Sequence, residues 1–345
     1  MPEIWTTLLR NVGPEPTGTD PLEFATAKEE SCLPRDAGVA SPLAHLGVIR
    51  VAGDDAEAFL HSQLTNAIER MPLPGSRLGA WCSAKGRMLA LFQVLRVDAG
   101  YLLITERELI SNLVKRLRMF VLRSKVEVED VSDGLALIGV AGEAAIPLLA
   151  EACGTPPTQA GGVVQAGDLT VLRLRDATPR FIVAAPAEQA GALWGLLSRG
   201  LSAVGTDAWR LRDVLAGLPT IKAATTERFV PQMANLEALE GLSYQKGCYP
   251  GQEVVARMHY LGRLKRRMYR IRGNSAAPPA AGTLVRDGGG REAGEIVIAA
   301  RAGRDVFEAL AVLRTDAAER EDLRADSATV QLRDLPYPVG DEGAT

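Results

Sequence analysis

The chain has few aromatic residues and few cysteines for its length. Of its 345 residues, 5% are aromatic and four are cysteine. The cysteines, Cys32, Cys82, Cys153 and Cys248, have no paired spacing, which argues against both a disulfide framework and a zinc site. A reduced, cytoplasmic setting is therefore expected. The cores must be built from Leu, Val, Ala and Ile, and the 47% apolar content is sufficient for this.

The sequence also lacks a long apolar run and a dominant charge. It contains no stretch of about 18 uninterrupted apolar residues and no basic N-terminal region followed by an apolar one. Neither a membrane span nor a signal peptide is therefore expected. The net charge of −3 gives no general electrostatic reason for nucleic-acid binding. His45, His61 and His259 stand apart from one another, which favours packing or surface roles, and no metal site is expected.

A short string recurs 89 residues later in the chain, because Val51-Ala52-Gly53 is echoed at Val140-Ala141-Gly142. Each copy follows an apolar strand pattern, at 46–51 and 135–140, and precedes a helical pattern of leucines. The repeat predicts a duplicated α+β layer in which helices cover antiparallel strands. The alternative is a chance similarity between short apolar strings.

The later part of each half also matches. Residues 101–104 and 181–184 are apolar strand patterns, and each leads into a helical pattern, at 106–120 and 187–197. Each half is therefore expected to run strand, helix, strand, strand, helix.

The helix expected at 106–120 has its own start signal. Thr105 and Glu108 have the spacing of a capping box. Apolar residues then recur at helical spacing and predict one buried stripe, formed by Leu109, Leu113, Leu117 and Phe120.

The pattern changes after residue 263. Short strand candidates follow one another, and Asp287-Gly288-Gly289-Gly290 marks a turn between two of them. This composition predicts a small, partly closed β-barrel. The strand candidates are 268–271, 283–286, 294–299, 306–313 and 329–332.

The length allows roughly two to three domains of about 100–200 residues each. An N-terminal extension rich in Pro, Gly, Thr, Asp and Glu is expected first, with a short helix at 4–10. Two α+β domains, the barrel and a tail follow it. The expected boundaries are 1–40, 41–134, 135–262, 263–335 and 336–345.

The string Lys246-Gly247-Cys248-Tyr249-Pro250-Gly251-Gln252-Glu253, followed by Arg257, is the strongest candidate for a site. Its glycines allow backbone turns closed to other residues and the close approach of a ligand. Lys246 and the first turn of a following helix would favour the thiolate form of Cys248. The alternative is that Cys248 is a small packed hydrophobe.

Other segments offer supporting candidates. A short helix at 252–258 would place Glu253 and Arg257 on one face, either as a surface ion pair or as a brace for the cysteine loop. The segment 229–235 contains the polar residues Gln232 and Asn235, and it either wraps a ligand or crosses a domain boundary.

Trp209 begins a helical stretch that also contains Arg210 and Arg212. A tryptophan with nearby arginines can stack on and pair with a flat, anionic ligand. Equally, Trp209 can belong to the core with the arginines solvated.

Two basic segments are weaker candidates. The turn at 83–87 lacks the glycine spacing of a phosphate loop. The run between 263 and 272 is a solvated strand face or, alternatively, an anion or RNA contact. Its members are Arg263, Lys265, Arg266, Arg267, Arg270 and Arg272.

Taken together, these residues resemble the YgfZ family of folate-binding proteins, which are relatives of the glycine-cleavage T-protein, an aminomethyltransferase. The resemblance covers about residues 41–335, and the string around Cys248 is its most specific part. The supporting matches are Val51 to Asp54, Phe59-Leu60, Gln63 to Asn66, Lys85-Gly86-Arg87, Phe229 to Asn235, Ala256-Arg257, Gly262 and Lys265-Arg266.

The resemblance implies an α+β fold with two ferredoxin-like domains and a C-terminal β-barrel around a central folate-binding channel. It implies a pocket for tetrahydrofolate or a one-carbon derivative, with Cys248 as the functional thiol and Lys246 as its activator. Leu46 stands where the family has a second tryptophan, which removes one stacking contact but still allows Leu46 to supply an apolar wall. The implied folate-binding residues are Leu46, Trp209, Arg212, Gln232, Asn235, Gly247, Tyr249, Gly251, Gln252, Glu253 and Arg257.

The resemblance further implies a role in the assembly or repair of iron-sulfur enzymes, including those of tRNA modification. Client enzymes or assembly proteins are then the expected partners, together with folate, and direct RNA binding is a weaker alternative. A single cysteine cannot hold a cluster by protein ligands alone.

The other hypothesis is a folate-dependent one-carbon transferase. In the T-protein, acidic residues follow the Lys-Gly turn, and one of them lies at the reacting folate. Here Met88-Leu89-Ala90-Leu91 follows Lys85-Gly86-Arg87. Without that carboxylate, help with charge and proton transfer is missing, and no turnover of this kind is expected.

Overall fold

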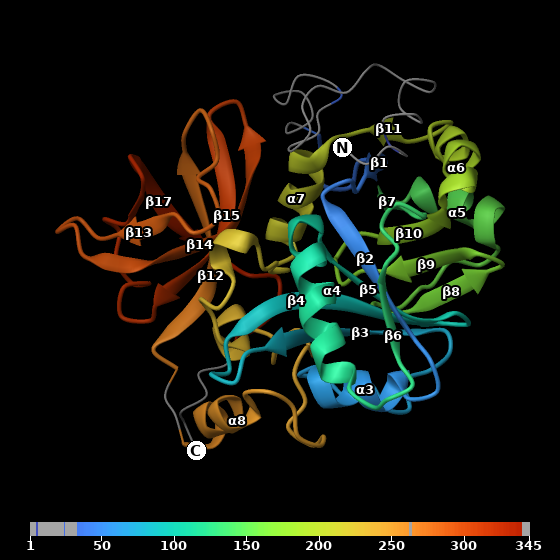
Figure 1. The fold of residues 1–345 in the computed structure, drawn as a ribbon. Coiled ribbons are helices and arrows are strands. Elements are labelled where there is room, and N and C mark those ends of the chain that lie inside the picture. Colours follow the sequence, from blue (N-terminus) through green and yellow to red (C-terminus); the bar gives the residue numbers. More distant parts are fainter. Residues whose placement is uncertain (1–4, 6–23, 25–32, 262–263, 340–345) are drawn as a thin grey trace. The chain divides into compact units, whose positions relative to one another are not determined.

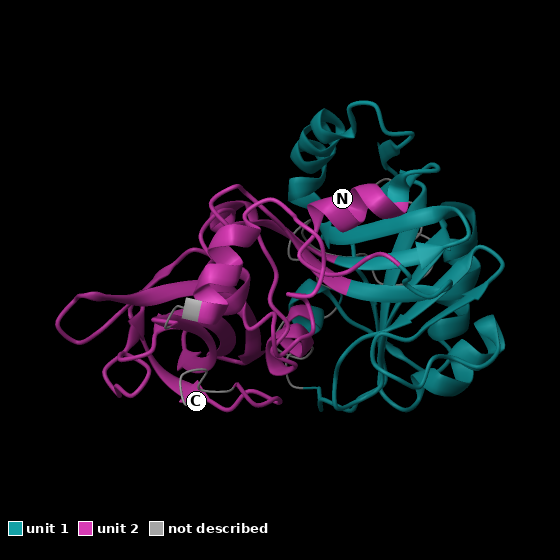
Figure 2. Cartoon of the chain, turned by 90° about the horizontal axis from the view of Figure 1, so that it is seen from below, with its two compact units in different colours: residues 1–56, 70–77, 93–209 teal, residues 57–69, 78–92, 210–345 magenta. Residues whose placement is uncertain are grey.

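The computed structural model describes residues 5, 24, 33–261 and 264–339 (Figure 1). The chain forms two compact units (Figure 2). Unit 1 consists of residues 1–56, 70–77 and 93–209, and unit 2 of residues 57–69, 78–92 and 210–345. The helix expected at 4–10 lies outside the described residues except for Trp5, which is buried in the core of unit 1.

The first half of the repeat contains a five-stranded sheet with the order β3-β4-β5-β2-β6. Strand β2 pairs antiparallel with both β5 and β6, and β4 pairs antiparallel with β5. The elements are β2 (Leu46–Ala52), α3 (Ala56–Gln63), β3 (Gly75–Cys82), β4 (Met88–Val97), β5 (Gly100–Glu106), α4 (Arg107–Val121) and β6 (Glu127–Asp130).

The second half repeats this succession in a six-stranded sheet with the order β11-β1-β7-β10-β9-β8. Its elements are β7 (Leu135–Ala141), α5 (Ala145–Cys153), β8 (Val163–Ala166), β9 (Leu169–Arg173), β10 (Arg180–Pro186), the 3₁₀ turn η1 (Ala187–Gln189), α6 (Ala190–Leu197) and β11 (Ser202–Ala203). The matching strand orders support the predicted duplication and confirm the α+β class.

One strand of the second sheet comes from before the first repeat. Strand β1 (Val39–Pro42) pairs antiparallel with β7 and parallel with β11. It takes the place beside β7 that β6 takes beside β2. Val39 and Ala40, which were expected in the extension, therefore belong to a sheet.

Strand β7 shows why the second sheet is buried on both faces. Alternate residues of a strand point to opposite faces. Ile138 and Val140 pack in a core with residues of α5 and α6, whereas Leu137 and Ala141 pack in a second core. That second core also contains Val48 and other residues of the first sheet, so the two sheets pack against each other within unit 1.

Helix α4 confirms most of its predicted pattern but not its start. Leu109, Leu113 and Leu117 are buried, whereas Phe120, in the last turn, is 44% exposed. The capping-box prediction was wrong. Thr105 lies in β5, and the N-cap is Glu106, which makes no side-chain capping bond. The strand runs directly into the helix, so the cap position falls on Glu106, the last residue of β5, rather than on Thr105.

The C-terminal part of unit 2 is a closed barrel with the order β12-β15-β14-β13-β16-β17. The sequence predicted five strands and partial closure. It missed the two-residue strand β16, which pairs with both β13 and β17 and so completes the barrel. The strands are β12 (Arg266–Asn274), β13 (Leu284–Arg286), β14 (Glu292–Gly303), β15 (Val306–Arg314), β16 (Arg324–Ala325) and β17 (Ala328–Arg333).

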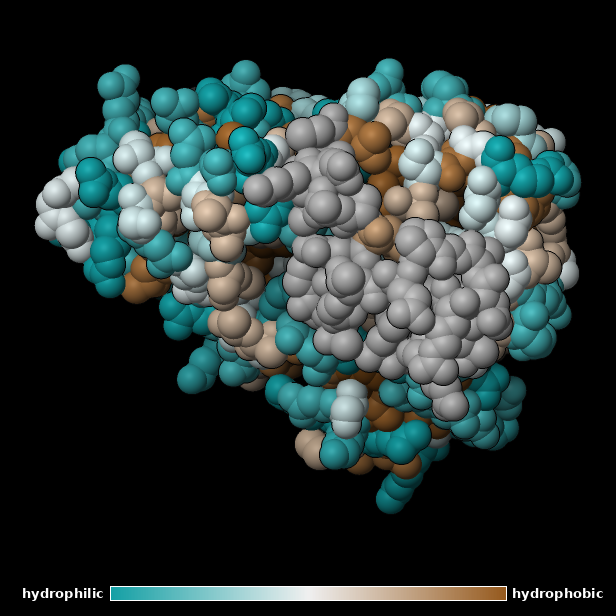
Figure 3. All heavy atoms as spheres, turned by 90° about the horizontal axis from the view of Figure 1, so that it is seen from above, coloured by the Kyte–Doolittle hydropathy of each residue, from teal (hydrophilic) through white to brown (hydrophobic). Residues whose placement is uncertain are grey.

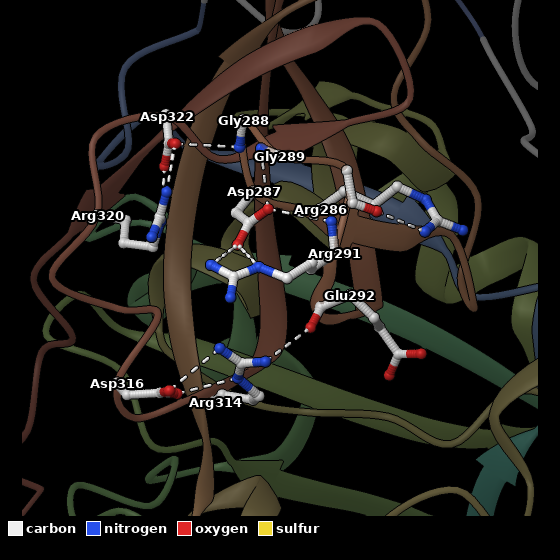
Figure 4. Close-up of polar contacts among 11 residues, drawn as sticks. Arg286, Asp287, Gly288, Gly289, Arg291, Glu292, Arg314, Asp316, Arg320 and Asp322 are labelled. Carbon is white, nitrogen blue, oxygen red and sulfur yellow. Dashed lines mark hydrogen bonds and ion pairs between the residues drawn. The ribbon is translucent and has the colours of Figure 1, made fainter.

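The predicted turn after β13 is held by a carboxylate. Oδ1 of Asp287 accepts hydrogen bonds from the backbone N–H groups of Gly289 and Arg291, each at 3.0 Å. Its Oδ2 pairs with the Arg291 guanidinium at 2.9 Å (Figure 4). Gly290 has φ +78°, a conformation that favours glycine.

Four short helical elements connect the sheets to the barrel: α7 (Thr206–Leu215), η2 (Ala223–Thr225), η3 (Pro231–Ala234) and α8 (Gln252–Leu261). The helix predicted at 252–258 is thus confirmed, and the one predicted from Trp209 begins three residues earlier. Within the described part of the chain, no helix has the length and apolar character needed to cross a membrane. On the face drawn in Figure 3, hydrophobic residues lie in small groups among hydrophilic ones.

Candidate functional site

The loop that carries Cys248 lies in unit 2 and leads directly into α8. Cys248 is exposed, whereas Cys82 and Cys153 are buried. The interpretation of Cys248 as a packed hydrophobe was therefore wrong. Burial raises the pKa of Cys82 to about 12 and also raises the pKa of Cys153. Cys32 lies outside the described residues.

Lys246 fastens this loop to the end of helix α3. Its ammonium group donates hydrogen bonds to the backbone carbonyl oxygens of His61 and Leu64. These carbonyls lie at the C-terminal end of the helix, where a positive charge is favoured. The ammonium also lies 5.0 Å from the centre of the Tyr249 ring. Burial lowers the pKa of Lys246 to about 8.

His61 also lies at the loop, which its isolated position in the sequence did not indicate. Its Nδ1 accepts hydrogen bonds from the backbone N–H groups of Ile68 and Glu69, at 3.3 and 3.2 Å. Burial first, and then the charge of Lys246, lower the pKa of His61. A neutral ring that accepts at Nδ1 carries its proton on Nε2. A Cβ added at Gly247 would lie 3.8 Å from that Nε2.

Two glycines bring the cysteine loop against the turn between β3 and β4. Gly251 has φ +79°, and an added Cβ would lie 2.4 Å from the carbonyl oxygen of Ser83 and 2.6 Å from the Cα of Gly86. Gly86, in turn, has φ +70°, and a Cβ added to it would lie 3.0 Å from the Cβ of Val254. Both positions therefore require glycine for conformation and for space.

Thr65 and Asn66 bind the segment at 240–241, which precedes the loop that carries Cys248. The Thr65 hydroxyl donates to the carbonyl oxygen of Gly241 at 2.8 Å and accepts from the N–H of Ala80 at 2.9 Å. The Asn66 amide donates to the carbonyl oxygens of Leu78 at 2.8 Å and Glu240 at 2.6 Å. Two of the motifs that carry the resemblance are thus brought together in unit 2.

A polar cluster fixes α8 to the same segment. Gln232 donates from Nε2 to the Tyr244 hydroxyl at 2.9 Å and to the carbonyl oxygen of Val255 at 2.7 Å. The Tyr244 hydroxyl donates to Glu237, which lies 3.2 Å from Nδ1 of His259. The Tyr244 and His259 rings stack at 3.9 Å. The sequence signalled only Gln232 of this cluster.

Three buried polar atoms near these contacts have no hydrogen-bond partner within the described residues. They are Oε1 of Gln232, Oδ1 of Asn235 and the Tyr249 hydroxyl. The Asn235 amide nitrogen donates to the carbonyl oxygen of Met268 at 3.0 Å, and the residue has φ +57°. Burial raises the pKa of Tyr249, so its hydroxyl stays protonated near neutral pH. Unpaired buried atoms of this kind call for a ligand or water.

Helix α8 begins with Gln252 and carries Glu253 and Arg257 on its exposed surface. The expected ion pair between Glu253 and Arg257 is not formed in the described structure. The helical spacing brings the two positions within reach, but at an exposed site the gain from pairing is small.

Trp209 and Leu46, two of the residues that the resemblance assigns to folate binding, both lie in unit 1. Trp209 is 1% exposed and packs directly on Gly139, whose added Cβ would lie 2.5 Å from the indole ring. The buried Arg180 guanidinium lies 5.2 Å from the Trp209 ring centre and pairs with Asp176 at 3.1 Å. Leu46 is partly buried against the same core. Arg210 and Arg212, which belong to unit 2, are buried rather than solvated.

Three arginines of the basic run at the start of the barrel have carboxylate partners. Arg266 pairs with Glu292 at 3.0 Å. Arg270 and Arg272 both pair with the buried Glu308, at 3.2 and 3.8 Å. Two carboxylates thus hold three arginines of the run in place, and the described part of the run keeps a net positive charge.

The turn at Lys85-Gly86-Arg87 leads into a strand that has no carboxylate at its start. Met88, Leu89 and Leu91 are all buried apolar residues of β4. Elsewhere in the described ranges, no three His, Cys, Asp or Glu side chains are arranged to hold a metal ion.

The fold and these motifs define a GcvT-like protein. The model of the GCVT N-terminal domain matches residues 18–239, and that of the CAF17 C-terminal beta-barrel domain matches residues 265–336. The crystal structure of the glycine cleavage system aminomethyltransferase T from Bartonella henselae superimposes with a TM-score of 0.75 and 16% identity, covering 96% of both chains.

More similar relatives fix the family. The tRNA-modifying protein YgfZ of Yersinia pestis (strain Pestoides F) is 34% identical over 301 residues, covering 86% of this chain and 91% of the relative. The protein of the same name from Yersinia enterocolitica (serotype O:8 / biotype 1B) is 32% identical over 301 residues. The chain belongs to the YgfZ family.

Proposed function

We propose that this protein binds tetrahydrofolate or a one-carbon derivative and assists the assembly or repair of iron-sulfur enzymes, including those that modify tRNA. The observation that carries the proposal is the exposed Cys248 on a loop fixed at both sides, by Lys246 and by Gly251, within a GcvT-like fold. An exposed thiol on a well-fixed loop suits chemistry rather than packing.

The residues present suit a folate. A pterin ring offers several hydrogen-bond donors and acceptors, and unit 2 has two buried acceptors, on Gln232 and Asn235, and one buried donor, on Tyr249, without partners in the described structure. The ring would be held by these atoms, while Trp209 and Leu46 belong to the core of unit 1. Bound folate would supply a one-carbon carrier.

The chain's own residues then have distinct tasks. Lys246 holds the loop at α3, Gly251 seats it on the turn at Gly86, and Cys248 presents its sulfur to solvent. His61, whose pKa is lowered by burial and by Lys246, accepts backbone hydrogen bonds at Nδ1 and can donate one from Nε2 at this loop. One cysteine can serve as one cluster ligand or as a nucleophile, and the partner must supply the rest.

The second candidate is a folate-dependent one-carbon transferase. The fold shared with an aminomethyltransferase favours it. The buried apolar start of β4, where a carboxylate would be needed, argues against it.

Calorimetry with tetrahydrofolate tests the binding proposal, and saturable binding is expected. Tyr249→Phe should weaken it, because the change removes the buried hydroxyl that has no partner in the described structure. Tyr101→Phe, at a buried tyrosine of unit 1, is the matched control. No binding at millimolar folate by the folded wild type would rule out a folate-binding function.

A cellular assay tests the iron-sulfur role. In cells lacking the protein, the wild type should restore the activity of iron-sulfur enzymes. Cys248→Ala should not, although its fold should be intact because the side chain is exposed. Cys153→Ala, at a buried cysteine of unit 1, is the control. Full restoration by Cys248→Ala would exclude the thiol from the function.

A further inference from the structure

Unit 2 contains a pocket of about 460 Å³ apart from the polar atoms described above. Three arginines from three separate segments line it: Arg87 from the turn before β4, Arg228 from the segment before η3, and Arg266 from the start of β12. The apolar side chains of Phe229 and Met233 complete one part of its lining. Its volume is in the range of small-molecule sites.

Two of the three arginines already have carboxylate partners. Arg228 holds the buried Glu295 through Nε and Nη2, at 3.0 and 2.9 Å, and this raises the pKa of Arg228. Arg266 pairs with Glu292. Their positive charges are therefore compensated, although Nη1 of Arg228 makes no hydrogen bond within the described ranges.

Arg87 differs from the other two. Its guanidinium donates from Nη1 to the carbonyl oxygen of Arg228 and makes no ion pair in the described structure. The remaining N–H groups form a planar donor set suited to a carboxylate or phosphate. Glu227, which also lines the pocket, is the one carboxylate there without an arginine partner among the described residues.

We propose that this pocket binds an organic anion, a carboxylate or phosphate carried on an apolar group. Arg87 and Nη1 of Arg228 recognise the anionic head, and Phe229 and Met233 contact the apolar part. The ion pair between Arg228 and Glu295 keeps the guanidinium of Arg228 in place without consuming its third nitrogen. Glu227 sets the affinity by repelling the same anion.

The pocket adjoins the cysteine loop through the chain itself. Arg87 follows Gly86, and Gly86 is the residue on which Gly251 is seated. An anion held by Arg87 would therefore bind at the turn that supports the loop. The site requires none of the atoms assigned to folate, and its test uses protein without folate.

The test is calorimetric titration of the full chain with phenyl phosphate, benzoate and inorganic phosphate. Phenyl phosphate or benzoate should bind saturably, and the tighter of the two identifies the head group. Arg87→Gln should weaken that binding by roughly tenfold or more, the usual loss for a charged hydrogen bond. Glu227→Gln should tighten it, because a like charge is removed.

Arg304→Gln, at an exposed arginine of the barrel, is the control and should bind as the wild type does. Met233→Asp adds a carboxylate to the apolar lining and should abolish binding while Arg87 is retained. Three results would overturn the proposal. They are no saturable binding of either organic anion, equal affinity in the wild type and Arg87→Gln, and inorganic phosphate binding as tightly as phenyl phosphate.

Discussion

Gly86 and Gly251 meet backbone to backbone, because a Cβ on Gly251 would lie 2.6 Å from the Cα of Gly86. The contact joins two motifs separated by 165 positions in the sequence. It seats the loop of Cys248 on the turn that precedes β4. A side chain on Gly251 would force backbone atoms to move, and one on Gly86 would crowd the side chain of Val254.

Gly251→Ala should therefore displace the cysteine loop. The new methyl group would meet backbone atoms at 2.4–2.6 Å, in addition to the strain of φ +79°. We expect a loss of about 2–4 kcal/mol in the free energy of unfolding, measured by urea denaturation.

Gly290→Ala is the matched control, because Gly290 has φ +78° but no atoms within 4 Å of an added Cβ. It should cost only about 1 kcal/mol. Equal losses in the two variants would show that the contact with Gly86 is not a constraint.

Cys248 should be alkylated faster than Cys82 and Cys153 near neutral pH. It is exposed, whereas burial protects the other two and raises their pKa values. The rate for each cysteine is measured by mass spectrometry under native conditions. Lys246→Ala should slow the alkylation of Cys248, because a nearby positive charge speeds the reaction of a thiol, and Lys246→Arg should preserve the rate. If Cys248 reacts more slowly than Cys82, it is not an accessible thiol.

Lys246 should give the protein a pH-dependent stability. Its pKa is about 8 in the folded chain and 10.5 in its unperturbed state, so between these values the unfolded chain binds the additional proton. The free energy of unfolding therefore rises with pH across this window. Because the side chain is partly exposed, the rise should be about 1–2 kcal/mol rather than the full shift.

The measurement compares urea unfolding of the wild type and Lys246→Met between about pH 7.5 and 10.5. The difference between the two proteins should grow in favour of the wild type as pH rises. Other titrating groups, including Cys82, are common to both and cancel. A constant difference would mean that Lys246 keeps an unperturbed pKa.

The purified protein should not transfer an aminomethyl group to tetrahydrofolate. Buried apolar residues begin β4, so the carboxylate that the sequence comparison led us to expect for such a transfer is missing there. The assay supplies an aminomethylated carrier protein and follows folate product, with a true T-protein as the positive control. Turnover near the rate of that control would instead establish the transferase hypothesis.

The sequence by itself predicted the repeated α+β halves, the barrel strands and the segment that carries Cys248. These features depend on local information, namely alternating apolar residues, helical spacing and glycine at turns. The resemblance added the family. The same local information failed at β16, which has only two residues, and at Thr105, where a strand passes directly into a helix.

Only the tertiary structure decided what each site residue contacts. Lys246 donates to carbonyl groups 182 and 185 positions away, and Trp209 packs on Gly139. Among the described residues, Arg87 is the arginine of its pocket that has no carboxylate partner. Periodic patterns in the sequence do not predict these contacts, because each contact joins segments that only the folding of the whole unit brings together. The sequence shows which polar and ionisable side chains each segment carries. The tertiary structure decides which of them are exposed and which are paired.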